Sequence, residues 1–216
     1  MSNDVPGLPA LALILFAPWF LILSALYWLY PRQPRNAARV RFDGFALLLA
    51  SPWAAAQSQD SPSLYLQAGS GRHGAYTATL GVTLPWNWAH ALGSGQLTGA
   101  WDLGLGTLSA RPEGAQRRSV TALGAGINLR WRPAQGASRW FVEAGTGLVW
   151  HNRHYANGDK YFSTRYNFAS HLGVGRNFGP QGRHALALRV QHQSNAGIKK
   201  PNPGDNFLLL RYAVAF

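Results

Sequence analysis

The chain contains no cysteine among its 216 residues. A chain without cysteine has no disulfide framework, no thiolate nucleophile and no metal site built from sulfur ligands. Charged residues are also scarce, at 13% of the sequence, whereas the chain contains 24 glycines, 9 tryptophans and 8 tyrosines. This composition is more typical of a β-protein with aromatic residues at a membrane interface than of a soluble helical domain.

Acidic residues are few, with 8 Asp and Glu against 20 Lys and Arg, which gives a formal net charge of +12. Such a balance suits nucleic acid, an anionic membrane or an acidic substrate. Nucleic-acid binding needs Lys and Arg clustered on one element. Here the arginines are spread along the chain, and the only lysines are Lys160, Lys199 and Lys200. The pattern therefore favours a phosphorylated lipid head group and argues against a nucleic-acid partner.

An uncharged apolar run extends from Val5 to Tyr30 and is long enough to span a bilayer as a helix. Two interpretations of residues 1–31 stay open. One is a membrane helix, and the other is a translation start placed too far upstream of the true product. The second needs a start codon other than ATG, because Met1 is the only methionine.

Residues 32–56 combine basic residues with a shorter apolar run, Gly44 to Ala56, which ends in three alanines. Basic residues, a short apolar core and a small-residue cleavage site together predict a secretory signal peptide. The mature domain is then expected at residues 57–216, beginning near Gln57.

Alternating segments recur from Ser63 onward between turns rich in Gly, Pro and Asn. The expected strands are Ser63–Ser70, Ala75–Trp86, Gly95–Leu108, Arg118–Trp131, Trp140–His151, Phe162–Phe178, His184–Ser194 and Asn206–Phe216. Repeated segments of this kind predict an all-β fold, an eight-stranded antiparallel transmembrane β-barrel, whose closure leaves no unpaired edge in the bilayer. The alternative is a soluble barrel, which would reverse the two faces and leave Arg189 and Arg211 outside.

The seventh segment alternates most clearly, because residues i and i+2 of a strand point to the same face. Its outer face is expected to carry His184, Leu186, Leu188, Val190, His192 and Ser194, and its inner face Ala185, Ala187, Arg189 and Gln191. Glu143 also alternates onto the inner face, where we expect it to pair with Arg189 or Arg211.

His192 and Ser194 are polar residues at the end of this apolar outer face, where polar groups facing lipid need a reason. An imidazole beside a serine hydroxyl is the minimum for acyl transfer. The Gly-x-Ser-x-Gly elbow of soluble hydrolases is absent, so the site must be built differently. The alternative is an inert polar pair at the level of the lipid head groups.

The segment around this pair, His192-Gln-Ser-Asn-Ala-Gly-Ile-Lys-Lys-Pro-Asn-Pro-Gly204, resembles the active-site segment of the outer-membrane lipid A 3-O-deacylases of PagL type. The resemblance includes Phe207-Leu-Leu-Leu-Arg-Tyr212, with weaker similarity at Ser63-Leu-Tyr-Leu-Gln-Ala-Gly69, and covers Ser63 to Phe216. It implies a serine esterase in the outer membrane of a Gram-negative bacterium. Its substrate would be the ester-linked acyl chain at the 3-position of lipid A in lipopolysaccharide.

The resemblance also implies roles for individual residues. Ser194 would be the nucleophile and His192 the general base. Asn195 matches an asparagine that the family needs for activity, and Asn195 with the backbone N–H of Gly197 would form the oxyanion hole. Lys199 and Lys200 would meet lipid A phosphates, or else be solvated loop lysines.

The acid of the triad is the point where the chain departs from the family. The family's acid position, fourteen residues after the histidine, holds Asn206, and Asp205 precedes it. Strand parity places Asn206 on the outer face with His192, whereas Asp205 nominally points inward. We nevertheless predict Asp205 as the acid, turned outward by a bulge, because an imidazolium needs an anionic partner.

Other functions of the chain stay open. With Asn206 at the acid position, the chain is either an esterase or a weak or inactive barrel with a structural or lipid-binding role. A third option is an outer-membrane phospholipase. His151 and His154 lack a carboxylate cluster, so neither a metal nor a cofactor is expected. The protein would be a monomer or a homodimer.

Overall fold

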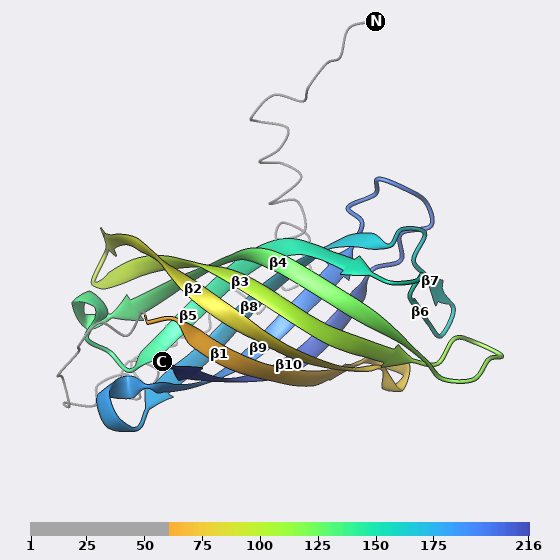
Figure 1. Ribbon diagram of the computed structural model, residues 1–216. Coiled ribbons are helices and arrows are strands. Elements are labelled where there is room, and N and C mark those ends of the chain that lie inside the picture. Colours follow the sequence, from red (N-terminus) through yellow and green to blue (C-terminus); the bar gives the residue numbers. More distant parts are fainter. Residues whose placement is uncertain (1–60) are drawn as a thin grey trace, which may run out of the picture. The chain divides into compact units, whose positions relative to one another are not determined.

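A computed structural model of the chain describes residues 61–216. The predicted membrane helix or upstream start at 1–31 and the predicted signal peptide at 32–56 lie outside the described residues, as does Gln57. Eight strands close into one antiparallel barrel in the order β1-β10-β9-β8-β5-β4-β3-β2, so the first strand pairs with the last (Figure 1). The predicted all-β, eight-stranded barrel is confirmed.

The barrel strands are β1 Ser63–Gly71, β2 Tyr76–Leu92, β3 Gly95–Ala110, β4 Arg118–Pro133, β5 Trp140–His151, β8 Tyr166–Phe178, β9 His184–Ser194 and β10 Asp205–Ala215. A separate two-stranded hairpin joins β6 Ala156–Asn157 to β7 Lys160–Tyr161. Three short 3-10 turns connect strands: η1 Arg72–Gly74, η2 Ala134–Gly136 and η3 Pro180–Gly182.

Most strand boundaries agree with the expectation to within two residues, and two differ by more. Strand β2 continues past Trp86 to Leu92, because a register shift between Pro85 and Ala89 absorbs the proline and pairing with β3 resumes. Strand β8 begins at Tyr166 rather than Phe162, because β7 of the β6–β7 hairpin ends at Tyr161 and residues 162–165 form a bent connection outside the barrel sheet.

The two faces of the barrel are arranged for a membrane. On β9 the outer Leu188 is 48% exposed, whereas Arg189, which follows it on the inner face, is 3% exposed. On β10 the same contrast separates Leu210, at 53%, from Arg211, at 3%. Apolar residues outside and polar residues inside define a membrane-spanning barrel and exclude the soluble alternative. Within residues 61–216, no helix is long and apolar enough to cross a membrane.

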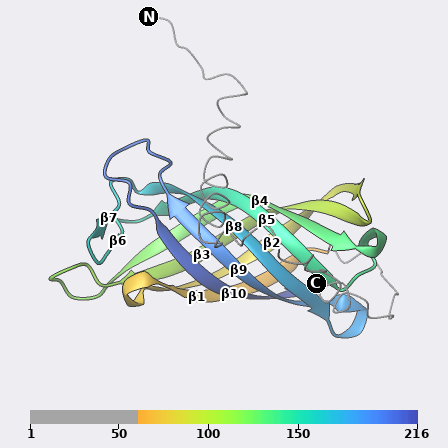
Figure 2. The same ribbon diagram turned by 180° about the vertical axis from the view of Figure 1, so that it is seen from behind.

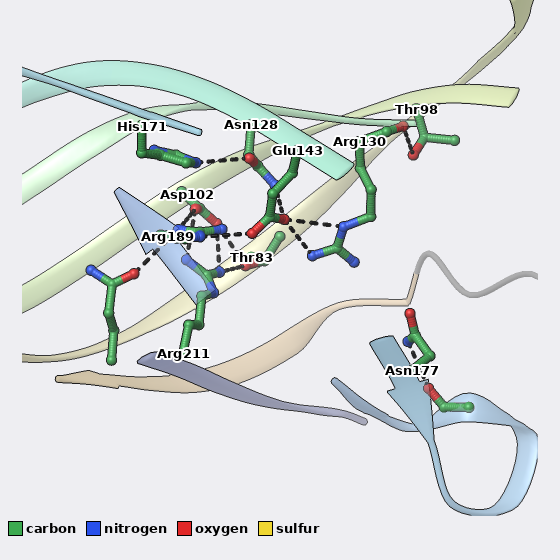
Figure 3. Close-up of polar contacts among 12 residues, drawn as sticks. Thr83, Thr98, Asp102, Asn128, Arg130, Glu143, His171, Asn177, Arg189 and Arg211 are labelled. Carbon is green, nitrogen blue, oxygen red and sulfur yellow. Dashed lines mark hydrogen bonds and ion pairs between the residues drawn. The ribbon is translucent and has the colours of Figure 1, made fainter. Parts of the chain in front are cut away.

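A network of ion pairs fills part of the barrel interior (Figure 3). The Glu143 carboxylate accepts from Arg189 Nε at 2.7 Å and lies 2.9 Å from Arg130 Nη2. Asp102 lies 2.8 Å from Arg211 Nη1. The predicted pairing of Glu143 with Arg189 is therefore confirmed, and the buried charges are compensated as burial requires.

The connections at the two ends of the barrel differ in size. The β3–β4 loop, the β6–β7 hairpin and the long β9–β10 connection lie at one end, and the C-terminus lies at the other (Figures 1 and 2). We call the first end the loop end. It is the end at which β9 delivers Ser194 and β10 begins.

Candidate functional site

His192 and Asn206 lie opposite each other in the regular pairing of β9 with β10. The His192 Nδ1 atom is 2.7 Å from Asn206 Oδ1. An amide oxygen can only accept, so Nδ1 carries the proton and donates it. In the neutral imidazole this contact selects the tautomer whose other ring nitrogen, Nε2, is unprotonated, which is the form that a general base requires.

Ser194 is the last residue of β9 and shares the outer face with His192, two residues earlier. Its side chain is buried, and its Oγ accepts a hydrogen bond from the Ala196 backbone N–H at 3.4 Å. No hydrogen bond joins Ser194 to His192 within residues 61–216. The two groups are brought to one surface, in an arrangement that a substrate can tighten.

Gly204 forms the floor under the His192 ring. A Cβ atom at this position would lie 2.7 Å from His192 Cε1, and the backbone φ of +61° also favours glycine. The imidazole therefore packs directly on the backbone that leads into β10. The ring is held by Gly204 below it and by Asn206 beside it.

Asp205 does not turn toward His192. Strand β10 pairs with β9 without a register shift, and Asp205 lies inside the barrel with 0% of its surface exposed. The bulge that would have turned it outward is absent from this pairing. The preference for Asp205 over Asn206 as the partner of His192 therefore disagrees with the geometry, because regular alternation keeps the Asp205 side chain on the opposite face.

The Asp205 carboxylate instead anchors the loop end. It accepts hydrogen bonds from Tyr155 Oη at 3.1 Å and Asn157 Nδ2 at 2.9 Å, and it pairs with Lys160 Nζ at 3.4 Å. Lys160 Nζ also donates to the Gly204 carbonyl at 2.7 Å. Burial and the neighbouring carboxylate raise the pKa of Tyr155, so its hydroxyl stays protonated and donates.

Asn195 folds the β9–β10 connection, which follows the predicted nucleophile. Its side-chain amide donates to Ser163 Oγ at 3.1 Å and to the Lys199 carbonyl at 2.7 Å. Its side-chain oxygen accepts from the Gly197 N–H at 3.0 Å. The two donors expected to form an oxyanion hole, the Asn195 amide and the Gly197 N–H, are thus both used inside the loop.

Ala196 offers a different donor. It has a left-handed backbone with φ of +53°, an uncommon conformation for a residue with a side chain. This conformation directs the Ala196 N–H toward Ser194 Oγ. A non-glycine residue in this region, placed directly beside a candidate nucleophile, is a feature that functional sites often show.

Lys199 and Lys200 are both exposed in this connection. Lys160 also lies at the loop end, in the β6–β7 hairpin, so all three lysines of the chain gather there. The two histidines considered as metal ligands are separated: His151 is buried against Gln193, and His154 contacts the Phe162 carbonyl. In the described part of the chain, no group of three or more His, Cys, Asp and Glu side chains is placed to hold a metal.

Sequence reasoning missed the residues that support the site from other segments, namely Tyr155, Asn157, Lys160, Ser163 and Gly204. Four of them belong to the β5–β8 connection, whose only sequence signal is the turn Asn157-Gly-Asp. Gly204 carries a signal that a closer reading of turns would use, because a glycine after proline at a strand start often has positive φ.

The chain is similar to known proteins over most of the barrel. The family model described as lipid A 3-O-deacylase (PagL) matches residues 74–215. A lipid A deacylase PagL of Bordetella bronchiseptica is 32% identical over 173 residues, which cover 78% of this chain and 92% of that protein. Another of Pseudomonas aeruginosa is 29% identical over 164 residues, which cover 74% and 88%.

A solved structure agrees with the fold. The crystal structure of the outer membrane enzyme PagL superposes with a TM-score of 0.61 at 24% identity, and covers 71% of this chain and 99% of that chain. The family model covers well over half of the sequence, and one relative exceeds 30% identity over nearly all of its own length. On these grounds, the chain belongs to the lipid A 3-O-deacylase (PagL) family.

Proposed function

We propose that the protein hydrolyses the ester bond at the 3-position of lipid A, with Ser194 as nucleophile and His192 as general base. Ser194 Oγ attacks the ester carbonyl carbon while His192 Nε2 takes the hydroxyl proton. The tetrahedral intermediate collapses, the C–O bond to the sugar breaks, and the imidazolium returns its proton to the sugar oxygen. Water, deprotonated by the same nitrogen, then releases the fatty acid from Ser194.

The observation that carries this proposal is the 2.7 Å contact between His192 Nδ1 and Asn206 Oδ1. It fixes the ring so that a basic nitrogen is left on the face that carries Ser194. An asparagine orients the histidine in this way in the Cys-His-Asn group of papain-like proteases. Asn206 therefore takes the position of the third catalytic residue, without the charge of a carboxylate.

The oxyanion of the intermediate needs a preorganised donor close to Ser194 Oγ. The Ala196 N–H is the backbone donor that already points there. We assign it as one oxyanion donor, and Asn195 as the residue that fixes the loop carrying it. Removing a single donor of this kind typically lowers kcat by roughly 10²–10³.

Asp205 and Lys160 act as positioning residues in this proposal. Asp205 holds the β6–β7 hairpin from inside the barrel, and Lys160 holds the carbonyl of Gly204, on which the His192 ring rests. Their effect on the reaction passes through the backbone of residues 204–206.

The substrate would reach the site from the membrane. Ser194 and His192 lie on the outer wall at the loop end, so an acylated lipid of the adjoining leaflet can present its ester there while its chains stay in the bilayer. The exposed Lys199 and Lys200 would attract the phosphates of lipid A. The proposed partner is lipopolysaccharide, in agreement with an outer-membrane location in a Gram-negative bacterium.

Mass spectrometry of lipid A from cells that express the protein tests the proposal. Wild type should remove one 3-hydroxyacyl unit, and Ser194→Ala, which differs by one oxygen atom, should remove none. Equal spectra for the two would contradict the proposal. Purified protein in detergent, given lipid A and a diacyl phospholipid separately, distinguishes a deacylase of lipid A from a phospholipase.

One observation favours a second candidate, a barrel with weak or no turnover. Asn206 cannot stabilise the imidazolium by charge, and the Asp205 carboxylate faces the interior. If Asn206→Glu raises the rate from a barely measurable level, the chain is a decayed enzyme. A clear wild-type rate that depends on Ser194 excludes this candidate.

A further inference from the structure

His192 and Asn206 belong to a row of polar side chains that runs from strand to strand across the outer wall of the barrel. Along the strand pairing, His192 lies opposite Ser170 of β8, and Ser170 lies opposite Thr146 of β5. The hydroxyls of Ser170 and Thr146 are 2.9 Å apart. Beyond Thr146 the row ends at Ile127 of β4. Four neighbouring strands thus place four polar side chains at one level of the membrane-facing wall.

The two hydroxyls lie within an otherwise apolar region. On the side toward the loop end, the paired outer residues are Leu148 and Phe168. On the other side they are Ala144 and Leu172, and Val190 continues that row on β9. Apart from His192 and Ser194 of β9, the outer-face neighbours of the hydroxyl pair are therefore apolar.

The Ser170 and Thr146 hydroxyls can together donate one more hydrogen bond. Two hydroxyls carry two protons, and the contact between them uses one. Within residues 61–216, the side chains of Ser170 and Thr146 make no other hydrogen bond. A hydroxyl proton without an acceptor in an apolar environment costs free energy, so a polar group of a ligand is favoured there.

The position of Ser170 relative to Ser194, the proposed nucleophile, defines which group of a ligand can reach it. Ser170 lies diagonally from Ser194, because Ser194 pairs with Phe168, two residues away from Ser170. Diagonal neighbours of this kind are about 7–8 Å apart. An acyl chain whose carbonyl carbon bonds to Ser194 Oγ can bring a substituent on its third carbon close to Ser170.

We propose that Ser170 and Thr146 form a subsite for a hydroxyl group on the third carbon of the acyl chain that is cleaved. Ser170 contacts this hydroxyl, and Thr146, one strand further away, is a positioning residue that holds the Ser170 hydroxyl. Ser170 is only 3% exposed, which suits a single hydroxyl group and not a bulky phosphate or sugar. The inference rests on the proposed function, because it assumes that Ser194 attacks an acyl ester.

Two synthetic substrates test the subsite. Both are glucosamine 1-phosphates with one acyl chain esterified at the 3-position, and they differ only by a hydroxyl on the third carbon of that chain. The ratio of their kcat/KM values is measured with the purified full-length barrel in detergent. Wild type should prefer the hydroxylated substrate about tenfold, the value of one hydrogen bond of roughly 1.4 kcal/mol.

Thr146→Val and Ser170→Ala should each bring this ratio close to one, mainly by lowering kcat/KM for the hydroxylated substrate. Thr107→Val is the matched control, because Thr107 of β3 also lies on the outer face opposite a threonine, Thr121 of β4. It lies on the far side of the barrel from β9 and should leave the ratio unchanged.

The outcomes separate the two proposals. If wild type hydrolyses neither substrate, the proposed function fails. If wild type hydrolyses both and the ratio is unaffected by Thr146→Val and Ser170→Ala, the function stands and the subsite is wrong. An equal loss on both substrates also overturns the subsite, because it indicates a general effect on His192.

Discussion

The imidazole of His192 is held by two contacts, one polar and one steric. Asn206 fixes which nitrogen carries the proton, and Gly204 allows the ring to rest on the backbone. Neither contact supplies a negative charge. The proposed rate therefore depends on the orientation of the His192 ring, and a negative charge at position 206 would add to it.

Substitutions of Asn206 separate these contributions. Asn206→Leu removes the acceptor for Nδ1, and the misplaced ring should lower kcat about 10²-fold. Asn206→Glu adds a charged acceptor on the same face and should raise kcat about tenfold, since charge-assisted hydrogen bonds are stronger than neutral ones. Initial rates of fatty-acid release measure both. An unchanged rate in Asn206→Leu would show that His192 does not depend on this contact.

Gly204→Ala tests the steric contact. The added methyl group would lie 2.7 Å from His192 Cε1 and should displace the ring, so we expect kcat to fall at least about tenfold with little change in KM. Gly93→Ala is the control, because Gly93 has a similar φ of +58° but no atom within 4 Å of the added group. Both variants carry similar backbone strain, so equal activities would exclude the proposed packing.

At the scale of elements, the β6–β7 hairpin and the start of β10 form one unit. Lys160 of the hairpin contacts the carbonyl of Gly204 and the carboxylate of Asp205, whereas Asn206 contacts His192. Adjacent residues of one strand therefore join the interior of the barrel to the site on its outer wall. In the proposed mechanism the hairpin supports the site, although it contributes no group to the reaction.

Lys160→Met keeps most of the side-chain volume but removes the charge. It should lower kcat roughly tenfold while KM stays constant, because Gly204 loses its anchor and Asp205 is left buried without a cation. Lys160→Arg should recover part of the rate. Arg153→Met, which removes an exposed cation from the same connection, serves as control. A fall in Arg153→Met equal to that in Lys160→Met would indicate a general charge effect.

The strands could be predicted from sequence because alternation of apolar and polar residues is a local property. The same alternation placed Asp205 inside and Asn206 outside, and the structure agrees. The preference for Asp205 as the acid disagreed with that alternation because it gave more weight to the need for an anion. The cluster around Asp205 could not be predicted, since Tyr155, Asn157 and Lys160 lie 45 to 50 residues away in sequence, with no periodic signal.

At the scale of the whole molecule, the interior charges make the barrel depend on a few ion pairs. Glu143 compensates both Arg189 and Arg130, and its side chain is fully buried. Removing one partner of a buried pair leaves the other charge without compensation. The stability of the barrel therefore depends on charges inside the wall, whereas the proposed nucleophile and base lie on its outer face.

Glu143→Leu should lower the free energy of unfolding by about 3–5 kcal/mol, measured by urea unfolding of the barrel in detergent. The double variant Glu143→Leu with Arg189→Met should lose less than the sum of the single losses, because each single change already removes the Glu143–Arg189 ion pair and the double variant removes it only once. Val142→Ala, on the outer face next to Glu143, should change stability only slightly. Additive losses in the double variant would contradict direct compensation.

In the proposed mechanism, the location of Ser194 and His192 on the outer wall also determines how the rate depends on substrate concentration. A site that opens sideways into the bilayer meets only molecules that diffuse within that leaflet, so substrate supply is two-dimensional. The relevant quantity is the fraction of substrate among the lipids around the barrel, rather than its amount per volume. Adding inert detergent at constant total substrate should therefore slow hydrolysis, whereas diluting protein and micelles together with buffer should leave turnover per molecule unchanged.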